Sequence, residues 1–472
     1  MSEYDAVVVG AGPNGLMAAI TMARAGRRTV VFEAASSAGG GSRSAALTEP
    51  GFVHDVCSSV HPTAVASPAF ATVPLAERGV EWCHPEIALA HPLADGRAAL
   101  VYRSVDETAR GLGVDGDAYR SLFGRYVAKA SAVSETLFAP FGVPRAPFTM
   151  ARFGLDAIRS VQGLTAHRFD GAEARAILAG ASAHSMVSLD SAGTAGYGLF
   201  LTLLAHAVGW PVAAGGSQRI ADALVAELQA HGGEVVTDHA VTALADLPPA
   251  RSVLLDITPR QLLALGGDEI PSRYRRTLRR YRYGPGVFKI DWALSGPVPW
   301  ANPEIGRAAT VHLGGTVAEI AASEAEVLAG RVPARPFVIF VQATVADPSR
   351  APAGRHTGWA YCHVPHGSTV DCTDAIEAQV ERFAPGFRDT ILARHTVHAA
   401  GMEAYDANYV GGDINGGAGT LRQVFTRPAV SPRPWVTPVP HTYLCSSATP
   451  PGGGVHGMCG WHAARAALRR DG

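Results

Sequence analysis

One short segment constrains the fold of this chain more than any other. Residues 4–34 read YDAVVVGAGPNGLMAAITMARAGRRTVVFEA. A short apolar run ends in three glycines spaced as Gly10-x-Gly12-x-x-Gly15, an apolar helical pattern follows, and a second apolar run ends in Glu33. This order predicts a βαβ unit that binds a dinucleotide, built from a strand over 6–9, a helix over 14–25 and a strand over 29–32.

Each residue of the pattern has a physical role in that unit. Gly10 permits a tight turn, Gly12 lets a pyrophosphate approach the backbone, and Gly15 lets the helix pack against the strand. The helix N-terminus, with Pro13 beside it, then faces the phosphates. Glu33, which lies eighteen residues beyond Gly15, is placed to accept hydrogen bonds from a ribose diol.

The composition indicates a compact, loop-rich enzyme. The chain has 472 residues with 17% charged, below the roughly 25% of typical globular proteins, and its 52 glycines exceed the usual share of about 7%. The formal net charge is −1. The locally basic run RRTLRRYR, over 275–282, fits a solvated helix face better than a nucleic-acid patch, so nucleic acid is not an expected partner.

The cysteines and the apolar segments bear on compartment and metals. Six cysteines are scattered without CxxC spacing, which predicts neither a zinc site nor a disulfide framework, and no other motif predicts a metal. We expect a reducing, cytoplasmic location, because the first apolar run is a strand and not a leader. The longest apolar stretch, 195–210, is interrupted by His206 and predicts a buried helix that lines a pocket; peripheral contact with a membrane stays open.

FAD is the cofactor that fits these segments. A nicotinamide dehydrogenase needs one glycine fingerprint, whereas this chain adds the pair Gly39-Gly40 six residues after Glu33 and a third glycine-lined turn over 452–454. We expect the first loop to hold the pyrophosphate, the 39–44 loop the pyrophosphate and ribityl side, and a terminal helix from about Val455 the pyrimidine edge. A helix N-terminus there favours the negative charge of a reduced flavin.

The pattern along the chain predicts an α/β fold with two discontinuous domains. A glutathione-reductase-like, Rossmann-type FAD-binding domain takes residues 1–75, 207–265 and 405–472, with Ser217 as an expected helix N-cap and strands over 252–255 and 442–445. An α+β substrate domain takes residues 76–206 and 266–404. Its alternating runs over 287–294, 336–341 and 358–364 predict a mixed or antiparallel sheet.

Over nearly its full length the chain resembles the phytoene-desaturase-like flavoproteins. Within them it most resembles the branch named pyridine nucleotide-disulfide oxidoreductase domain-containing proteins, in the wider group that includes monoamine oxidases. The resemblance is carried by VVVGAGPNGL, GFVHD followed by His61-Pro62, GWPVAAGGSQ, FKIDWALSGPVPW, GGDINGG and YLCSSATPPGGGVHG. It implies non-covalent FAD, a two-domain fold and substrate oxidation by hydride loss to flavin N5.

Together, the motifs and the resemblance predict a set of cofactor contacts spread over the whole chain. They are Gly10, Gly12, Pro13, Asn14, Gly15, Glu33, Gly39, Gly40, Ser42, Arg43, Val241, Gly453, Gly454, Val455 and His456.

Three departures from the family pattern bear on function. Many relatives have arginine directly after the paired glycines, where this chain has Gly41, and Arg43 lies two residues further on. Close relatives often have His-Pro before the last glycines, where this chain has Pro450-Pro451. Amine oxidases often line the flavin face with paired aromatics, one of them from the C-terminal segment, and 446–458 contains none. The last departure disfavours an amine substrate.

Two residues are candidates for catalysis. The place of Lys289 resembles that of the lysine which holds a water against flavin N5 in amine oxidases; the alternative is a lysine on a solvated strand face, paired with Asp291. His61 follows the GFVHD segment and is a candidate acid or base near N5, or else a structural histidine. His456 is expected at the second position of the terminal helix, where a neutral ring is favoured.

The sequence therefore predicts an FAD-dependent dehydrogenase or desaturase that acts on a largely apolar small molecule. Oxygen, a quinone or another carrier would accept the electrons. A flavin amine oxidase that releases hydrogen peroxide is the alternative enzyme, and an FAD-binding partner protein without turnover is the alternative of another class.

Overall fold

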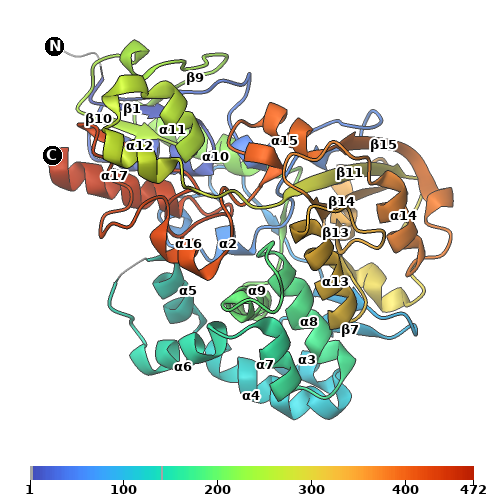
Figure 1. The fold of residues 1–472 in the computed structure, drawn as a ribbon. Coiled ribbons are helices and arrows are strands. Elements are labelled where there is room, and N and C mark those ends of the chain that lie inside the picture. The colour runs from blue at the N-terminus through green and yellow to red at the C-terminus, as the bar shows by residue number, and fades with distance from the viewer. Residues whose placement is uncertain (1–3, 140–141, 472) are drawn as a thin grey trace.

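The computed structural model describes residues 4–139 and 142–471 (Figure 1). Two sheets lie side by side, and a group of helices lies below them in the view of Figure 1. The five-stranded sheet has the order β16-β10-β1-β2-β9 and its strands are parallel. Its strands are β1 Ala6–Val9, β2 Thr29–Phe32, β9 Glu234–Val236, β10 Ser252–Leu255 and β16 Thr442–Leu444.

Helices cover the five-stranded sheet, so the continuous apolar run of β1 is buried, as parallel strands require. Helix α1 (Pro13–Arg24) contacts α10 (Gln218–Ala230) on one side and α17 (Met458–Asp471) on the other. The contact with α17 is close: a Cβ on Gly460 would lie 1.8 Å from the carbonyl oxygen of Asn14. The two ends of the chain thus meet at the same helix.

The seven-stranded sheet has the order β15-β11-β14-β13-β12-β6-β7. Neighbouring strands run antiparallel except for β6 and β12, which run parallel, so the predicted mixed sheet is confirmed. The strands are β6 Ile87–Pro92, β7 Ala98–Val101, β11 Gly286–Leu294, β12 Ala308–Leu313, β13 Val338–Val341, β14 His356–Val364 and β15 Ile391–Val397.

The seven-stranded sheet is buried on both faces. Phe288, Ile290 and Trp292 of β11 pack with helix α14 (Thr373–Glu381), and the alternate residue Val287 joins the core on the other face. That second core includes the helical part of the chain. Its helices are α3 Val105–Arg110, α4 Gly116–Val127, α5 Ala130–Phe138, α6 Pro147–Ala157, α7 Val161–Arg168, α8 Ala172–Ala183 and α9 Thr194–Ala207.

Helix α9 is the buried helix expected from the apolar stretch over 195–210. Within 4–139 and 142–471, no helix combines the length and the apolar character needed to cross a bilayer. The strands of the five-stranded sheet come from 6–32, 234–255 and 442–444, and those of the seven-stranded sheet from 87–101 and 286–397. The domain boundaries drawn from the sequence stay a prediction.

One local expectation is wrong, and another is confirmed in position only. The last helix begins at Met458 and not near Val455, because residues 452–457 form the turn before it. Ser217 does occupy the N-cap position of α10, but its hydroxyl makes no capping bond. It donates instead to the carbonyl oxygen of Ser58 at 2.7 Å, a contact between distant segments.

Candidate functional site

A cavity of about 1420 Å³ lies where the two sheets and the helical part meet. Its wall contains the loops after β1 and β2, the turn before α17, residues of β13 and β14, and residues of α5, α6 and α9. A drug-sized ligand needs about 300–1,000 Å³, so this space is large enough for a cofactor together with a substrate.

The nucleotide end of the cavity is a cradle of closely packed glycines. A Cβ on Gly15 would lie 2.0 Å from the carbonyl oxygen of Gly10, and one on Gly12 would lie 3.0 Å from Oδ2 of Asp256. The second glycine loop stacks on the first, since a Cβ on Gly40 would lie 3.2 Å from Cα of Gly12. Side chains at these positions would collide with neighbouring segments, so the two loops and β10 can lie this close only because glycines occupy them.

Polar atoms without partners face the same space. At the N-terminus of α1, whose N-cap is Gly12, Pro13 has no N–H and the Gly15 N–H donates to Asp256, so the Asn14 N–H is the first-turn donor left for an anion. Asn14 and Asn408 line the cavity, and Oδ1 of each is buried without a hydrogen-bond partner. Buried amides usually have partners. The described residues therefore fit a bound dinucleotide such as FAD.

Glu33 lies at the end of β2 and lines the cavity. Oε2 accepts a hydrogen bond from the Ala11 N–H at 2.7 Å, and Oε1 accepts from the Ala35 N–H at 2.9 Å and from Arg43 Nη2 at 3.0 Å. Arg43 is held in turn by the carbonyl oxygen of Ser37, to which its Nε donates at 3.0 Å. The carboxylate is thus fixed where a ribose diol is expected.

Two further carboxyls line this end of the cavity, and the sequence analysis gave them no role. Asp256 follows β10, and its Oδ2 accepts from the Gly15 N–H at 2.9 Å. Burial raises the pKa of Asp256 to about 8 and also raises the pKa of Asp406, which lies beside Gly40. A signal was present: Asp256 stands at the carboxyl end of a parallel strand next to β1, where α/β sheets bind ligands.

The structure explains why Gly41 replaces the arginine of many relatives. A Cβ at this position would lie 2.0 Å from the hydroxyl oxygen of Tyr409 and 3.4 Å from its Cζ. Tyr409 therefore occupies the space that a side chain at Gly41 would need. Arg43 occupies the cavity wall instead, 5.5 Å from the ring centroid of Tyr405.

The turn before α17 closes the cavity from the far end of the chain. Gly453, Gly454, Val455 and His456 all line it. The ring of His456 is buried, and its Nδ1 accepts from the Met458 N–H at 3.1 Å. Burial lowers the pKa of His456 to about 4, so the ring is neutral and acts as a cap for α17.

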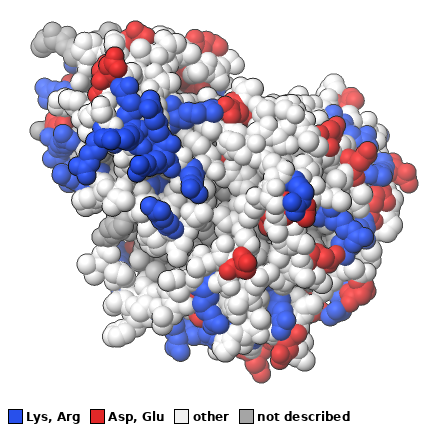
Figure 2. Space-filling view, in the orientation of Figure 1, with Lys and Arg blue, Asp and Glu red and all other residues white. Residues whose placement is uncertain are grey.

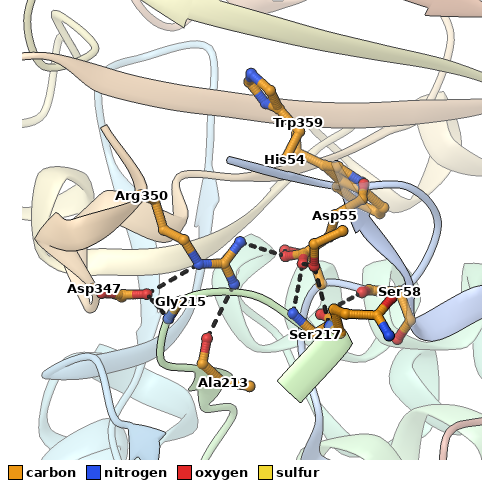
Figure 3. Close-up of polar contacts among 12 residues, drawn as sticks. His54, Asp55, Ser58, Ala213, Gly215, Ser217, Asp347, Arg350 and Trp359 are labelled. Atoms are coloured by element: carbon orange, nitrogen blue, oxygen red, sulfur yellow. Dashed lines mark hydrogen bonds and ion pairs between the residues drawn. The ribbon is translucent and has the colours of Figure 1, made fainter. Parts of the chain in front are cut away.

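A buried network around Asp55 supports the cavity wall at 57–60 (Figure 3). Oδ2 of Asp55 accepts from Arg350 Nη1 at 3.1 Å and Ser59 Oγ at 2.7 Å. Oδ1 accepts from the Ser217 N–H at 2.8 Å and Ser44 Oγ at 2.7 Å. Burial alone would raise the pKa of Asp55, but Arg350 and these hydrogen bonds lower it to about 2.

Arg350, which the sequence analysis missed, joins three distant segments in this network. It is fully buried, donates from Nε to Asp347 at 2.9 Å, and donates from Nη2 to the carbonyl oxygen of Ala213 at 3.1 Å (Figure 3). Trp359, a cavity residue, donates to the carbonyl oxygen of Asp55 at 2.9 Å. The network therefore fixes part of the wall at 57–60 and, through Trp359, part of the wall that β14 forms.

His61 does not reach the cavity surface, although its neighbours Val60 and Pro62 do. Its ring is fully buried, and Nε2 lies 2.8 Å from Ser217 Oγ. Burial lowers the pKa of His61 to about 4. The proposed contact of His61 with the reacting flavin is therefore corrected: the side chain packs behind the wall, in the place of a structural histidine.

Lys289 also lies behind the wall. It pairs with Asp291, as one alternative expected, but the pair is buried, so the expected solvated face is wrong. His395 Nδ1 and His54 Nδ1 lie 3.5 Å and 3.7 Å from the same carboxylate. Lys289 Nζ is 5.8 Å from the ring centroid of Trp359, which separates it from the cavity. The predicted direct role at flavin N5 has no support from this placement.

The other end of the cavity, which we name the apolar chamber, is lined by side chains of the helical part and the seven-stranded sheet. The rings of Trp359 and Tyr361 stand perpendicular there, with centroids 5.3 Å apart. Both rings belong to β14 and line the cavity. The chamber residues include Met150, Phe153, Phe200, Leu201, Ile339, Val341, Trp359 and Tyr361.

Known proteins match the chain over almost all of its length. A family profile described as an NAD(P)-binding Rossmann-like domain matches residues 8–73. The chain is 25% identical to pyridine nucleotide-disulfide oxidoreductase domain-containing protein 2 of Rattus norvegicus, over 99% of this chain and 94% of that protein. The predicted resemblance is confirmed.

Solved structures share the fold. An oxidoreductase from Methanosarcina mazei aligns with a TM-score of 0.65 and 16% identity, over 98% of this chain and 100% of that one. Putrescine oxidase bound to putrescine aligns with a TM-score of 0.61 and 18% identity, over 99% of each chain. The predicted fold, a Rossmann-type domain joined to an α+β substrate domain, is confirmed.

Most of the residues predicted to hold the cofactor converge on the cavity, from four separate parts of the chain. Those that line it are Gly10, Gly12, Pro13, Asn14, Glu33, Gly40, Arg43, Val241, Gly453, Gly454, Val455 and His456. Gly15, Gly39 and Ser42 lie one layer behind. Gly15 donates to Asp256, and Ser42 donates from its N–H and its hydroxyl to the carbonyl oxygen of Gly39.

Proposed function

We propose that this chain is an FAD-dependent dehydrogenase that desaturates a largely apolar small molecule. The observation that carries the proposal is the continuity of the cavity, which runs from the three glycine-lined turns into the apolar chamber. When bound, FAD supplies the hydride acceptor at N5. Because both ends share one space, a substrate in the chamber would lie against the cofactor without a separate channel.

Residues at one end of the cavity would bind the cofactor, and residues at the other end would enclose the substrate. The N-terminus of α1 and the Gly40 loop would hold the pyrophosphate, and Glu33 the adenosine ribose. The carboxyls of Asp256 and Asp406 sit under these loops; in its protonated form Asp256 adds no negative charge beside the phosphates. The turn before α17 would hold the flavin edge. The chamber then excludes water from the reacting bond.

The lining of the chamber supports a neutral substrate. The carboxylates that line the cavity, Glu33, Asp256 and Asp406, all lie at the nucleotide end. His184 is the titratable imidazole on the chamber wall, and its Nε2 lies 3.0 Å from Nε2 of His312. Burial lowers the pKa of His184 to about 3, so the ring is neutral. It would orient a hydroxyl or carbonyl group of the substrate by a hydrogen bond and not by charge.

Anaerobic titration tests this proposal. Purified protein loaded with FAD is mixed with apolar alcohols, isoprenoids, lipids and amines, and the loss of the visible flavin absorbance is recorded. We expect bleaching by an apolar, uncharged compound and a weaker response in His184→Ala. Stopped-flow mixing of the reduced protein with oxygen or a quinone then identifies the acceptor. Protein that stays colourless and refuses FAD would refute the proposal.

The two alternatives predict different outcomes of the same titration. An amine oxidase would bleach with an amine and release hydrogen peroxide; the shared fold with putrescine oxidase supports this reading, whereas the absence of a carboxylate from the described chamber wall opposes it. A non-catalytic FAD carrier would bind FAD and bleach with none of the compounds.

The free thiols of all six cysteines support the cytoplasmic location that we propose.

A further inference from the structure

Large apolar side chains that face solvent lie on two segments of the cavity wall, α6 with its flanks and the segment over 425–430. Among the described residues, ten large hydrophobic side chains are exposed, and six of these belong to α6 and its flanks or to the segment over 425–430. We name these six the apolar rim: Val143 (94% exposed), Phe148 (92%), Leu155 (72%), Ile158 (56%), Phe425 (63%) and Val430 (86%). Ile158 and Phe425 also line the cavity.

Helix α6 is apolar on both of its faces. Phe148, Ala151 and Leu155, at positions i, i+3 and i+7, lie on the exposed face. Met150 and Phe153 point the other way, since both line the cavity. A surface helix normally has one polar face, and large exposed apolar patches usually mark binding surfaces. The outer face of α6 therefore lacks a partner within the described chain.

Basic side chains gather in a patch on one face of the molecule, which we name the arginine patch (Figure 2). It lies over α12 (Ser272–Leu278) and α16 (Leu421–Thr426), and Figure 2 shows the basic side chains gathered there. Among the described residues none of its side chains takes part in an ion pair, and the nearby Asp268 is paired with Arg275. The patch consists of the exposed residues Arg273, Arg276, Arg279, Arg280, Arg282, Arg422 and Arg433.

Direct contacts join the patch to the rim. The Arg282 N–H donates to Gln423 Oε1 at 3.2 Å, and Gln423 Nε2 donates to the Arg282 carbonyl oxygen at 2.7 Å. Gln423 belongs to α16, the helix that carries Phe425. Next to α6, the Gly193 N–H donates to the carbonyl oxygen of Ile158 at 2.9 Å. A Cβ on Gly193 would lie 3.0 Å from Leu421 of α16, so the two segments meet.

We propose that this face docks on an anionic phospholipid bilayer, with the apolar rim among the headgroups and the arginine patch against lipid phosphates. Apolar side chains beside clustered arginines are the combination that interfacial membrane binding requires. An apolar substrate would then pass from the bilayer into the chamber without crossing water, which extends the proposed function. Nucleic acid would engage the arginines but leave the apolar rim in water.

Vesicle flotation tests the docking. The purified FAD-loaded protein is floated with vesicles of phosphatidylcholine alone or of an equimolar mixture with phosphatidylglycerol, at low and high salt. We expect binding to the mixed vesicles, weakened by salt. F148S/L155S and R276E/R279E should each lower the bound fraction about tenfold. The controls L328S/L392S, at leucines that are 47% and 49% exposed elsewhere on the surface, and R110E/R335E should bind as the parent protein does.

Each other outcome decides against the proposal. The proposal would be overturned if the rim and patch variants bound the mixed vesicles as well as their controls do. It would also be overturned if the parent protein bound both kinds of vesicle equally. If the parent protein forms a dimer and F148S/L155S is monomeric, the face belongs to an interface with a second copy. If the protein binds duplex DNA and not vesicles, the arginine patch belongs to a nucleic-acid site. Thermal melting checks that each variant is folded. The assay involves no turnover, so its failure is distinct from failure of the proposed oxidation.

Discussion

The two ends of the cavity are built by different means. At the nucleotide end, the shape depends on glycines whose backbone lies too close to its neighbours for a side chain. A Cβ on Gly15 would meet Gly10, and one on Gly41 would meet Tyr409. In the apolar chamber, large side chains from several helices and strands form it. The nucleotide end therefore tolerates few substitutions. Substitutions in the apolar chamber can change its shape, and so the compound that it would accept. One fold can in this way keep a cofactor and vary its chemistry.

Gly15→Ala attacks the rigid end most directly. The new Cβ would lie 2.0 Å from the carbonyl oxygen of Gly10, so the loop or α1 has to move away from the pyrophosphate position. We expect FAD binding to be lost, at least about a hundredfold in affinity, in a flavin fluorescence titration. Gly124→Ala, at a helix position with nothing within 4 Å, should bind FAD normally. Normal binding by Gly15→Ala would contradict the rigid cradle.

Arg350→Met tests the network that joins the two ends. It leaves Asp55 and Asp347 buried without their cation, and breaking a buried pair in this way costs about 3–5 kcal/mol. Chemical denaturation should show that loss, and FAD binding should weaken as well. The exposed Arg355, whose substitution by Met should change stability little, provides the control. A loss of similar size in both variants would remove the special role of Arg350.

Gly41→Ala tests the nucleotide end at a single contact, because the new Cβ would collide with one atom of Tyr409. The Tyr409 hydroxyl oxygen would be 2.0 Å from the new Cβ, but the ring Cζ would be 3.4 Å away. We expect a loss of about 1–3 kcal/mol in FAD binding for Gly41→Ala. Removing the hydroxyl in Gly41→Ala/Tyr409→Phe should restore most of it. A double variant as weak as the single one would show that another contact excludes side chains at Gly41.

Acid should destabilise both ends together. Burial lowers the pKa to about 4 for His54, His61 and His456 near the nucleotide end and for His91 and His206 in the substrate part. As pH falls from about 6.5 to about 4, the unfolded chain takes up protons that the folded chain does not, so stability falls. Thermal melts across this range should show a decreasing Tm; a flat profile would contradict neutral, buried rings.

Much of the fold could be predicted from local patterns. The strands over 6–9, 29–32 and 252–255 have the predicted bounds, because unbroken apolar runs beside glycine loops have few other uses. The last helix was placed three residues too early, since glycines and His456 continue an apolar pattern without helical geometry. The glycine loops of the candidate site were predicted correctly, because they act through the backbone. The positions of single side chains such as Lys289 and His61 were predicted less well.

What the sequence alone determined is the cofactor cradle, because each glycine there acts through its own backbone and its immediate neighbours. Only the tertiary structure decided which side chains face the cavity: it set Lys289 and His61 behind the wall and brought Arg350 to Asp55, 295 residues away. It also brought Arg282 of the arginine patch against α16, the helix that carries Phe425 of the apolar rim. Such placements follow from packing between distant segments, which leaves no periodic signal along the chain.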